Sequence, residues 1–287
     1  MNILVTGCHG QLGTELQKIA DAGTPHRWLF TDVDTLDITN MTAVEECFAA
    51  NQIDVCINCA AYTAVDLAEE QDMIAAFINS FAPKLLADTC LKNNALLVHV
   101  STDYVFDGTG ERPYLETDPI HPQSVYGCTK AEGERLVRES GCNHVIVRTA
   151  WLYSSTGKNF VKTMLALADT KDEINVVCDQ HGSPTWAGDL AQALTLLVDH
   201  YGKGPVSETF HFTNEGQTTW FDFTRAIFDI AGKDCKVNPI TTDQYPTKAK
   251  RPAYSVLDKS KIKQTLGIEI PFWSDSLARC IEELKNK

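Results

Sequence analysis

The sequence predicts an α/β protein: a doubly wound, Rossmann-type parallel sheet followed by a smaller C-terminal substrate-binding lobe. In the first half of the 287 residues, short apolar runs alternate with segments of helical periodicity, which is typical of a parallel sheet covered on both faces. A glycine-rich turn directly follows the first apolar run. Beyond residue 152 the alternation loosens. We therefore expect a dinucleotide-binding domain over residues 1–152 and a lobe over residues 153–287, from which some segments can return to the main sheet.

Each element of the first half is predicted from its own pattern. The first strand is the apolar run at residues 3–6, and Leu12, Leu16 and Ile19 recur at the spacing of a helix over residues 10–20. The other strands expected in this half are equally apolar and cover residues 28–31, 55–58, 96–100 and 145–147. The helices between them cover residues 41–50, 75–92 and 126–139.

The C-terminal half is predicted in looser order. Its strands are expected at residues 174–178 and 210–213. Its helices are expected at residues 188–198, 221–230 and 274–285. Glycine and proline predict loops over residues 202–205 and 246–252.

The composition is that of a globular protein, with 44% hydrophobic and 22% charged residues. A formal net charge of −13 argues against a nucleic-acid or membrane partner, because either requires a basic surface. The longest apolar stretches fall short of the roughly 20 residues that span a bilayer. Met1 leads directly into a strand without a targeting segment, so we expect a cytoplasmic protein.

The ten cysteines are scattered singly, which favours reduced thiols over a disulfide framework. Cys56 and Cys59 form a C-x-x-C pattern in a predicted strand, where odd spacing directs the two sulfurs to opposite faces. No second pair completes a zinc set. We therefore expect neither a metal nor a redox role for this pair.

Gly7, Gly10 and Gly13 lie between the first strand and the first helix. Small residues at these positions let the chain turn sharply, let backbone amides approach a pyrophosphate and let the helix pack against the strand. The amino end of the helix, with Gln11 and Leu12, offers free N–H donors and a partial positive charge. The spacing is G-x-x-G-x-x-G, and its place after the first strand predicts a dinucleotide site.

Asp32 ends the second strand, where an acidic side chain accepts hydrogen bonds from the adenosine ribose. A carboxylate there repels a 2′-phosphate and so favours NADH over NADPH, although His26 and Arg27 could accommodate NADPH. Asp37 and Ile38 are candidates to flank the adenine, with an ordinary loop before a helix as the alternative. The cofactor is therefore predicted to be NADPH or NADH.

Tyr126 and Lys130 are the predicted catalytic pair. Residues at i and i+4 share one helix face, so the phenol and the ammonium can serve one site. A free phenol titrates near pH ~10, and a nearby cation is expected to bring it toward the working range. Ser101 and Thr102 end the fourth strand, and Thr102 is expected to hold the substrate oxygen. A lone Y-x-x-x-K pattern usually marks a solvated helix face, but its combination with the glycine loop favours catalysis.

These motifs together resemble an extended short-chain dehydrogenase/reductase. Within that superfamily, sugar-nucleotide dehydratases carry an Asp-Glu pair after the strand-end threonine, whereas here Thr102 is followed by Asp103-Tyr104. The series resembles the dTDP-4-dehydrorhamnose reductases, over residues 1 to about 280. The segments that carry this resemblance are residues 101–108, 126–130, 148–153, 179–185 and 251–252.

The resemblance implies reduction of dTDP-4-dehydro-β-L-rhamnose at C4 to dTDP-β-L-rhamnose, a precursor of cell-surface polysaccharide. It implies that Tyr126 donates the proton and that Lys130 is its partner and a ribose ligand. It also implies three sugar contacts, Thr102, Asp103 and Trp151. The positions implied to hold the cofactor are Gly10, Gln11, Leu12, Asp32, Asp37, Ile38, Ala61, Tyr62, Thr63 and Val100.

Three of these assignments have alternatives. Trp151 could be a core tryptophan, and Asp103 could brace its loop. Arg251 could meet the diphosphate through its planar donors or could remain on the surface. Some family members dimerise around magnesium, and Glu15 is in a matching place, but Gly188 stands where an acid would be expected. We therefore expect no metal site, and a monomer or a homodimer.

Two competing functions remain open. Another epimerase or dehydratase of the same fold would recycle its cofactor without net consumption of NAD(P)H. A non-catalytic regulatory subunit would have no chemical need for Thr102, Tyr126 and Lys130, which are all present.

Overall fold

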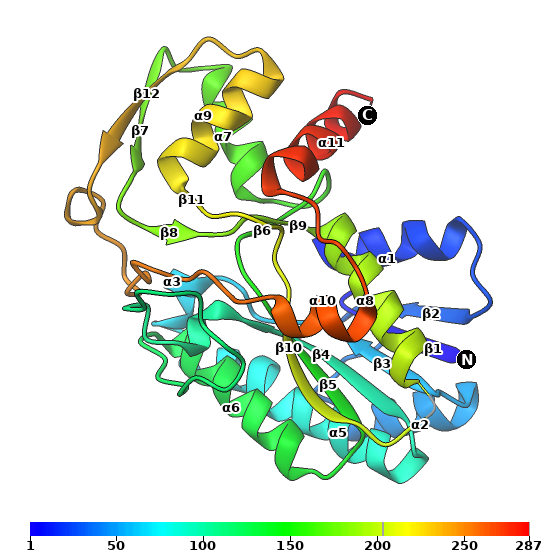
Figure 1. Cartoon of the computed structure of the whole chain (residues 1–287). Helices are drawn as coiled ribbons and strands as arrows, with labels where there is room; N and C mark the ends of the chain where they lie inside the picture. The colour runs from blue at the N-terminus through cyan, green and yellow to red at the C-terminus, as the bar shows by residue number, and fades with distance from the viewer. Residues whose placement is uncertain (203, 287) are drawn as a thin grey trace.

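The computed structural model describes residues 1–202 and 204–286. Lys203, within the predicted loop 202–205, and Lys287, at the end of the predicted lobe, lie outside the described residues. The main sheet has six parallel strands in the order β10-β5-β4-β3-β1-β2 (Figure 1). This confirms the predicted α/β class with a doubly wound parallel sheet. Its strands are β1 (Asn2–Thr6), β2 (Arg27–Thr31), β3 (Val55–Asn58), β4 (Leu96–Thr102), β5 (His144–Thr149) and β10 (Ser207–His211).

The strand order reverses at β1, because the chain first adds β2 on one side and then β3, β4 and β5 on the other. Such a reversal opens a crevice at the carboxyl ends of the strands, where ligands bind in open α/β sheets. Strand β10 comes from the C-terminal half and pairs with β5 from Ser207↔His144 to His211↔Arg148. It begins before the predicted run at residues 210–213, because an edge strand tolerates the polar Ser207 and Glu208 at its start.

Helices cover both faces of this sheet (Figure 1). Leu4, Cys56 and Leu97 pack with residues of α2, α5 and α6 on one face. Val5, Ile57 and Val98 pack with residues of α1, α8 and α10 on the other. The covering helices are α1 (Gln11–Asp21), α2 (Met41–Asn51), α5 (Ala82–Asn93), α6 (Val125–Glu139), α8 (Ala187–Tyr201) and α10 (Ser260–Leu266).

A second apolar core lies outside the main sheet and joins α7, α9 and α11 with β7 and β12. In Figure 1 these elements form the upper part of the molecule. The helices are α7 (Phe160–Ala168), α9 (Trp220–Ala231) and α11 (Trp273–Lys285). The short strand pairs beside them are β7 (Glu173–Val177) with β12 (Lys236–Ile240), β8 (His181–Gly182) with β11 (Thr218–Thr219), and β6 (Leu152–Tyr153) with β9 (Thr185–Trp186).

The helix predicted over residues 75–92 is longer and less regular in the structure. It runs from α4 (Asp72–Ala76) through a π-helical turn (Phe77–Phe81) into α5. By length and composition alone, Asp72–Asn93 could cross a membrane, contrary to the expectation that every apolar stretch is too short. More than half of its most apolar window, 56%, is buried within the protein, as in the core helix of a globular fold.

Cys56 and Cys59 point to opposite faces of the sheet, as their odd spacing predicted. Cys56 lies in the core beneath α2 and α5, whereas Cys59 packs against the core beneath α1 and α8. Both are free thiols.

Candidate active site

A cavity of about 540 Å³ opens at the carboxyl ends of β1, β3, β4 and β5. Thirteen of the residues predicted from the sequence line this cavity, from both the glycine loop and the catalytic set. They are Gly7, Gly10, Gln11, Leu12, Gly13, Ala61, Thr63, Val100, Thr102, Asp103, Tyr126, Lys130 and Trp151. The fold therefore brings the glycine loop at residues 7–13 to the same cavity as Tyr126 and Lys130, which lie more than 100 positions further along the sequence.

The glycine loop (residues 7–13) forms a cradle, a backbone concavity that any side chain at Gly7 or Gly13 would fill. A Cβ atom on Gly7 would stand 2.7 Å from the backbone nitrogen of Ala60, and Gly7 has a positive φ of 67°. A Cβ atom on Gly13 would stand 2.5 Å from the Cα of Cys8. The first helix therefore packs directly on the loop, as a pyrophosphate-binding turn requires. Gln11 adds a buried side-chain oxygen without a partner among the described residues, and this loop fits a dinucleotide.

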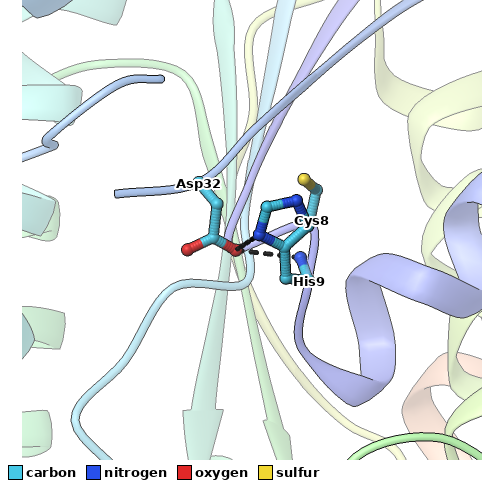
Figure 2. A group of neighbouring side chains, drawn as sticks. All are labelled: Cys8, His9 and Asp32. Carbon is cyan, nitrogen blue, oxygen red and sulfur yellow. Dashed lines mark hydrogen bonds and ion pairs between the residues drawn. The ribbon is translucent and has the colours of Figure 1, made fainter. Parts of the chain in front are cut away.

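Asp32 lies outside the lining of the cavity, beside the glycine loop (Figure 2). Its carboxylate accepts hydrogen bonds from the backbone N–H of His9 (2.8 Å) and of Val33 (2.9 Å). Within residues 1–202 and 204–286, only Cys8, His9 and Asp32 bring three possible metal ligands within 4.8 Å of one another. Its two backbone hydrogen bonds hold the Asp32 carboxylate against the glycine loop.

Helix α6 positions the predicted catalytic pair. Ser124 caps the helix by accepting a hydrogen bond from the Gly127 N–H (3.1 Å), which fixes where the first turn begins. Tyr126 and Lys130 are both buried on its inner face, with side chains that are 9% and 2% exposed. The Lys130 ammonium donates to the Val100 carbonyl over 2.7 Å and so ties α6 to β4.

The pKa of Tyr126 differs from the sequence prediction. Burial raises the pKa of this phenol, a hydrogen bond with Thr102 opposes that rise, and Lys130 makes no contribution. The expected lowering of the pKa by the ammonium is therefore wrong for this structure, because Lys130 is directed to the Val100 carbonyl. A raised pKa keeps Tyr126 protonated at neutral pH, which is the state that a proton donor needs.

Burial lowers the pKa of Lys130 to about 8, with Glu134 and Cys59 opposing the shift. At neutral pH the ammonium is therefore mainly charged. The pKa of Asp103 shifts in the opposite direction: burial raises the pKa of its carboxyl group to about 6. The Thr102 hydroxyl donates to Asp103 over 2.9 Å, so the two predicted sugar contacts form one hydrogen-bonded unit.

Trp151 is held in an unusual backbone conformation, with φ at +49°. Its ring stacks on Trp220 with 3.4 Å between ring centroids, and its other neighbour is Gly182, where a Cβ atom would stand 2.5 Å from the indole. Neither Trp220 nor Gly182 was predicted as part of the site. Trp220 lies 69 residues further along the sequence at the start of α9, so no local pattern could have revealed the contact.

Replacing Trp220 by alanine is expected to raise the KM for the expected sugar-nucleotide substrate roughly 2- to 12-fold, because an aromatic stack contributes about 0.5–1.5 kcal/mol. Steady-state kinetics with varied sugar nucleotide would measure this change. Trp220→Phe retains an aromatic face and should restore most of the affinity. An unchanged KM in Trp220→Ala would show that Trp151 holds its position without the stack.

Five predicted residues lie outside the cavity lining: Asp32, Asp37, Ile38, Tyr62 and Arg251. Asp37 accepts hydrogen bonds from the backbone N–H and the hydroxyl of Thr39, and so braces the turn before α2. Ile38 is buried. The Tyr62 hydroxyl donates to Gln71 over 2.8 Å. These placements correspond to the local structural roles that short loops commonly have.

Arg251 pairs with Asp66 of α3 (Val65–Ala68) at 2.6 Å. This ion pair joins the loop at residues 246–252 to the N-terminal half. Beside it, burial raises the pKa of Tyr104 to about 12, and Arg251 opposes that rise. Tyr104 lines the cavity, so Arg251 stands behind the lining.

Asn79 supports the site from outside the cavity lining, and the sequence analysis missed it. The π-helical turn at Phe77–Phe81 places its amide against the Tyr62 backbone, which it contacts at both N–H (2.9 Å) and carbonyl (3.0 Å), and against the Thr129 hydroxyl (3.2 Å). It therefore connects the loop after β3 with the catalytic helix α6. Gly133 of α6 faces Asn79. Only a glycine fits at this position, because a Cβ atom on Gly133 would stand 2.1 Å from the Asn79 carbonyl oxygen.

Glu15, the acid considered for a metal-linked dimer, and Asp189, which follows Gly188, are both engaged within the chain. Glu15 is buried and accepts a hydrogen bond from Ser154 (2.6 Å), and it pairs with Lys18 (2.8 Å). Asp189 pairs with Arg279 at 2.8 Å. Gly188 packs against Trp186, which a Cβ atom would approach to 2.8 Å, so the core excludes an acidic side chain there.

The doubly wound sheet, the glycine cradle and the buried Tyr126–Lys130 pair beside Thr102 define a nicotinamide-dependent oxidoreductase of the extended short-chain dehydrogenase/reductase type. The model of the RmlD substrate binding domain family matches residues 1–286. The chain belongs to this family.

Relatives with known names support this membership. The chain is 44% identical over 286 residues to a dTDP-4-dehydrorhamnose reductase of Aggregatibacter actinomycetemcomitans, with 96% of each chain covered. Its structure matches the crystal structure of a dTDP-4-dehydrorhamnose reductase from Clostridium acetobutylicum with a TM-score of 0.94 and 46% identity, over 99% of this chain and 100% of that one. The reductase of Bacillus anthracis, solved in complex with NADP, matches with a TM-score of 0.92 and 36% identity, over 98% and 99%.

Proposed function

We propose that this protein reduces the C4 ketone of dTDP-4-dehydro-β-L-rhamnose to give dTDP-β-L-rhamnose, with NADPH or NADH as the reductant. The observation that carries the proposal is the convergence of Thr102, Tyr126 and Lys130 with the glycine loop on one cavity. Relatives with 36% identity or more over nearly the whole chain bear the name of this reductase, and one is solved with NADP.

The residues of the chain account for the acid–base half of this reaction. When bound, the nicotinamide cofactor supplies the hydride. The buried, protonated Tyr126 donates its proton to the C4 oxygen, so that a ketone, a hydride and a proton give a secondary alcohol. Thr102 orients that oxygen by a hydrogen bond, and Lys130, held by the Val100 carbonyl, is proposed to bind the cofactor ribose.

Sugar recognition is proposed to rest on Thr102, Asp103 and Trp151, all of which line the cavity. The flat indole of Trp151 offers an apolar face to the sugar ring, and its fixed stack on Trp220 lowers the entropic cost of binding. Arg251 lies behind Tyr104 and is proposed to contact the diphosphate. Its Nη2 donates to Asp66, whereas its buried Nη1 has no partner among the described residues and is the donor proposed for this contact.

We place this activity in the cytoplasm, because all ten cysteines are free thiols, as is typical of a reducing compartment. The product is proposed to serve the synthesis of cell-surface polysaccharide. The chain is proposed to act as a monomer or a homodimer.

One assay tests the proposal directly. The purified protein is supplied with enzymatically prepared dTDP-4-dehydro-β-L-rhamnose, and oxidation of NADPH and of NADH is followed separately at 340 nm. We expect stoichiometric oxidation with at least one cofactor and formation of dTDP-rhamnose. Absence of oxidation with both cofactors would contradict the proposal, and conversion of the keto sugar to an isomer without net cofactor oxidation would indicate an epimerase instead.

A further inference from the structure

Helix α6 carries a third buried ionisable residue one turn beyond the catalytic pair. Tyr126, Lys130 and Glu134 follow one another at intervals of four residues and therefore lie along the same side of the helix. Glu134 is 0% exposed. Unlike Tyr126 and Lys130, it does not line the cavity, so it touches neither cofactor nor sugar.

The Glu134 carboxylate is held by two arginines. Arg148 of β5, itself 1% exposed, donates to both carboxylate oxygens, with Nε at 2.9 Å from one and Nη2 at 2.8 Å from the other. Arg138 of α6 donates to one of them over 2.8 Å. These contacts, together with a contribution from Ser101, hold the pKa of Glu134 at about 2 although burial opposes the shift. The carboxylate is therefore charged at any pH at which the protein works.

The charge of Glu134 matters because the groups that face Lys130 are otherwise neutral. From β3, burial keeps the pKa of the Cys59 thiol well above neutral. From β4, burial lowers the pKa of His99, so its ring is uncharged. Tyr126 on the same helix is protonated. Among the described groups that act on the Lys130 ammonium, Glu134 is therefore the one anion.

We propose that Glu134 is a positioning residue for the Tyr126–Lys130 pair: its buried charge keeps the proton on the Lys130 ammonium, and Arg148 fixes that charge in place. This inference rests on the proposed function of the pair. Removal of a buried negative charge favours loss of the proton from a nearby ammonium. Glu134 therefore sets the pH at which the pair stops working.

The sign of the effect follows from the charges. The active pair is a neutral phenol with an ammonium, and it loses its first proton as the pH rises through the Lys130 pKa of about 8. Without Glu134, the uncompensated charges of Arg148 and Arg138 would favour that loss. The alkaline limb of the activity profile would then move to lower pH by about one unit or more.

The test compares Glu134→Gln with the wild-type protein and with Glu132→Gln. Glu132 lies on the same helix but is partly exposed and pairs with Arg135, so it is the matched control. For each protein, kcat and the dissociation constant of NADPH are measured from pH 6 to pH 10. We expect the alkaline limb of both profiles to move to lower pH in Glu134→Gln alone, with near-normal values retained at pH 6.

Two further variants keep the test decisive if Glu134→Gln folds poorly. Glu134→Asp keeps the charge and should return both limbs toward the wild-type position. Arg138→Gln removes a cation from a side chain that is 35% exposed, and should move the limbs to higher pH.

The proposal would be overturned if the alkaline limbs of both pH profiles stayed at the wild-type position in Glu134→Gln. If Glu134→Gln cannot be purified, unchanged limbs in Arg138→Gln would overturn it. A loss of equal size at every pH would do the same, because purely structural damage has no preferred pH. Failure of the proposed function would appear differently: the wild-type protein would show no turnover, while the NADPH-binding profiles would still report on Glu134.

Discussion

Tyr126→Phe is expected to lower kcat by about 10²–10⁴-fold, the usual contribution of a positioned general acid. The substitution removes one hydroxyl group and leaves the ring, which packs edge-on against Tyr104 at 5.4 Å between centroids. Cofactor affinity should change little, because the glycine loop and Lys130 are untouched. Turnover of the 4-keto sugar nucleotide and the dissociation constant of NADPH would measure the two effects separately.

The matched control for this variant is Tyr104→Phe. Tyr104 also lines the cavity, but its hydroxyl lies beside Arg251, whereas the Tyr126 hydroxyl lies beside Thr102. We expect a change in kcat of less than about tenfold for this control, in keeping with a group that does not donate a proton. If Tyr126→Phe retained wild-type turnover, the proton would have to come from another group, and Tyr104 or Asp103 would be the next candidates.

Local patterns predicted the parallel sheet well because each buried strand is a short apolar run that hardly depends on distant residues. The segment at residues 55–58 coincides with β3, and α2 begins at the predicted Met41. The π-helical turn at Phe77–Phe81 could not be predicted, because its wider backbone depends on Asn79 reaching Tyr62 and Thr129. That contact exists only after the helix has docked on α6.

The residues of the candidate site also fall into two groups: those that depend on local structure and those that depend on distant contacts. The glycine loop is a local structure, so its residues could be identified from spacing alone, and they line the cavity together with Tyr126 and Lys130. Trp220, Gly182 and Glu134 act through contacts with distant residues, and no sequence spacing records such contacts. The pKa of Tyr126 was predicted with the wrong sign for the same reason. Spacing placed the ammonium near the phenol, but it could not show that both would be buried or that Val100 would bind the ammonium.

Gly13→Ala is the second variant with a large expected effect. Its added methyl group would stand 2.5 Å from the Gly7 carbonyl oxygen and 2.5 Å from the Cys8 Cα, both of which are backbone atoms that no side-chain rotation can move. Either the loop or α1 must shift, and the pyrophosphate cradle opens. We expect the dissociation constants of NADPH and NADH to rise by about 100-fold or more, equivalent to roughly 2.7 kcal/mol.

Fluorescence titration of each cofactor would measure this loss, and thermal unfolding would separate it from a general loss of stability. Gly204→Ala is the control, because a Cβ atom at Gly204 meets nothing within 4 Å. Unchanged cofactor affinity in Gly13→Ala would mean that α1 can withdraw from the loop without disturbing the site. The close packing of helix on strand would then be a requirement of folding and not of dinucleotide binding.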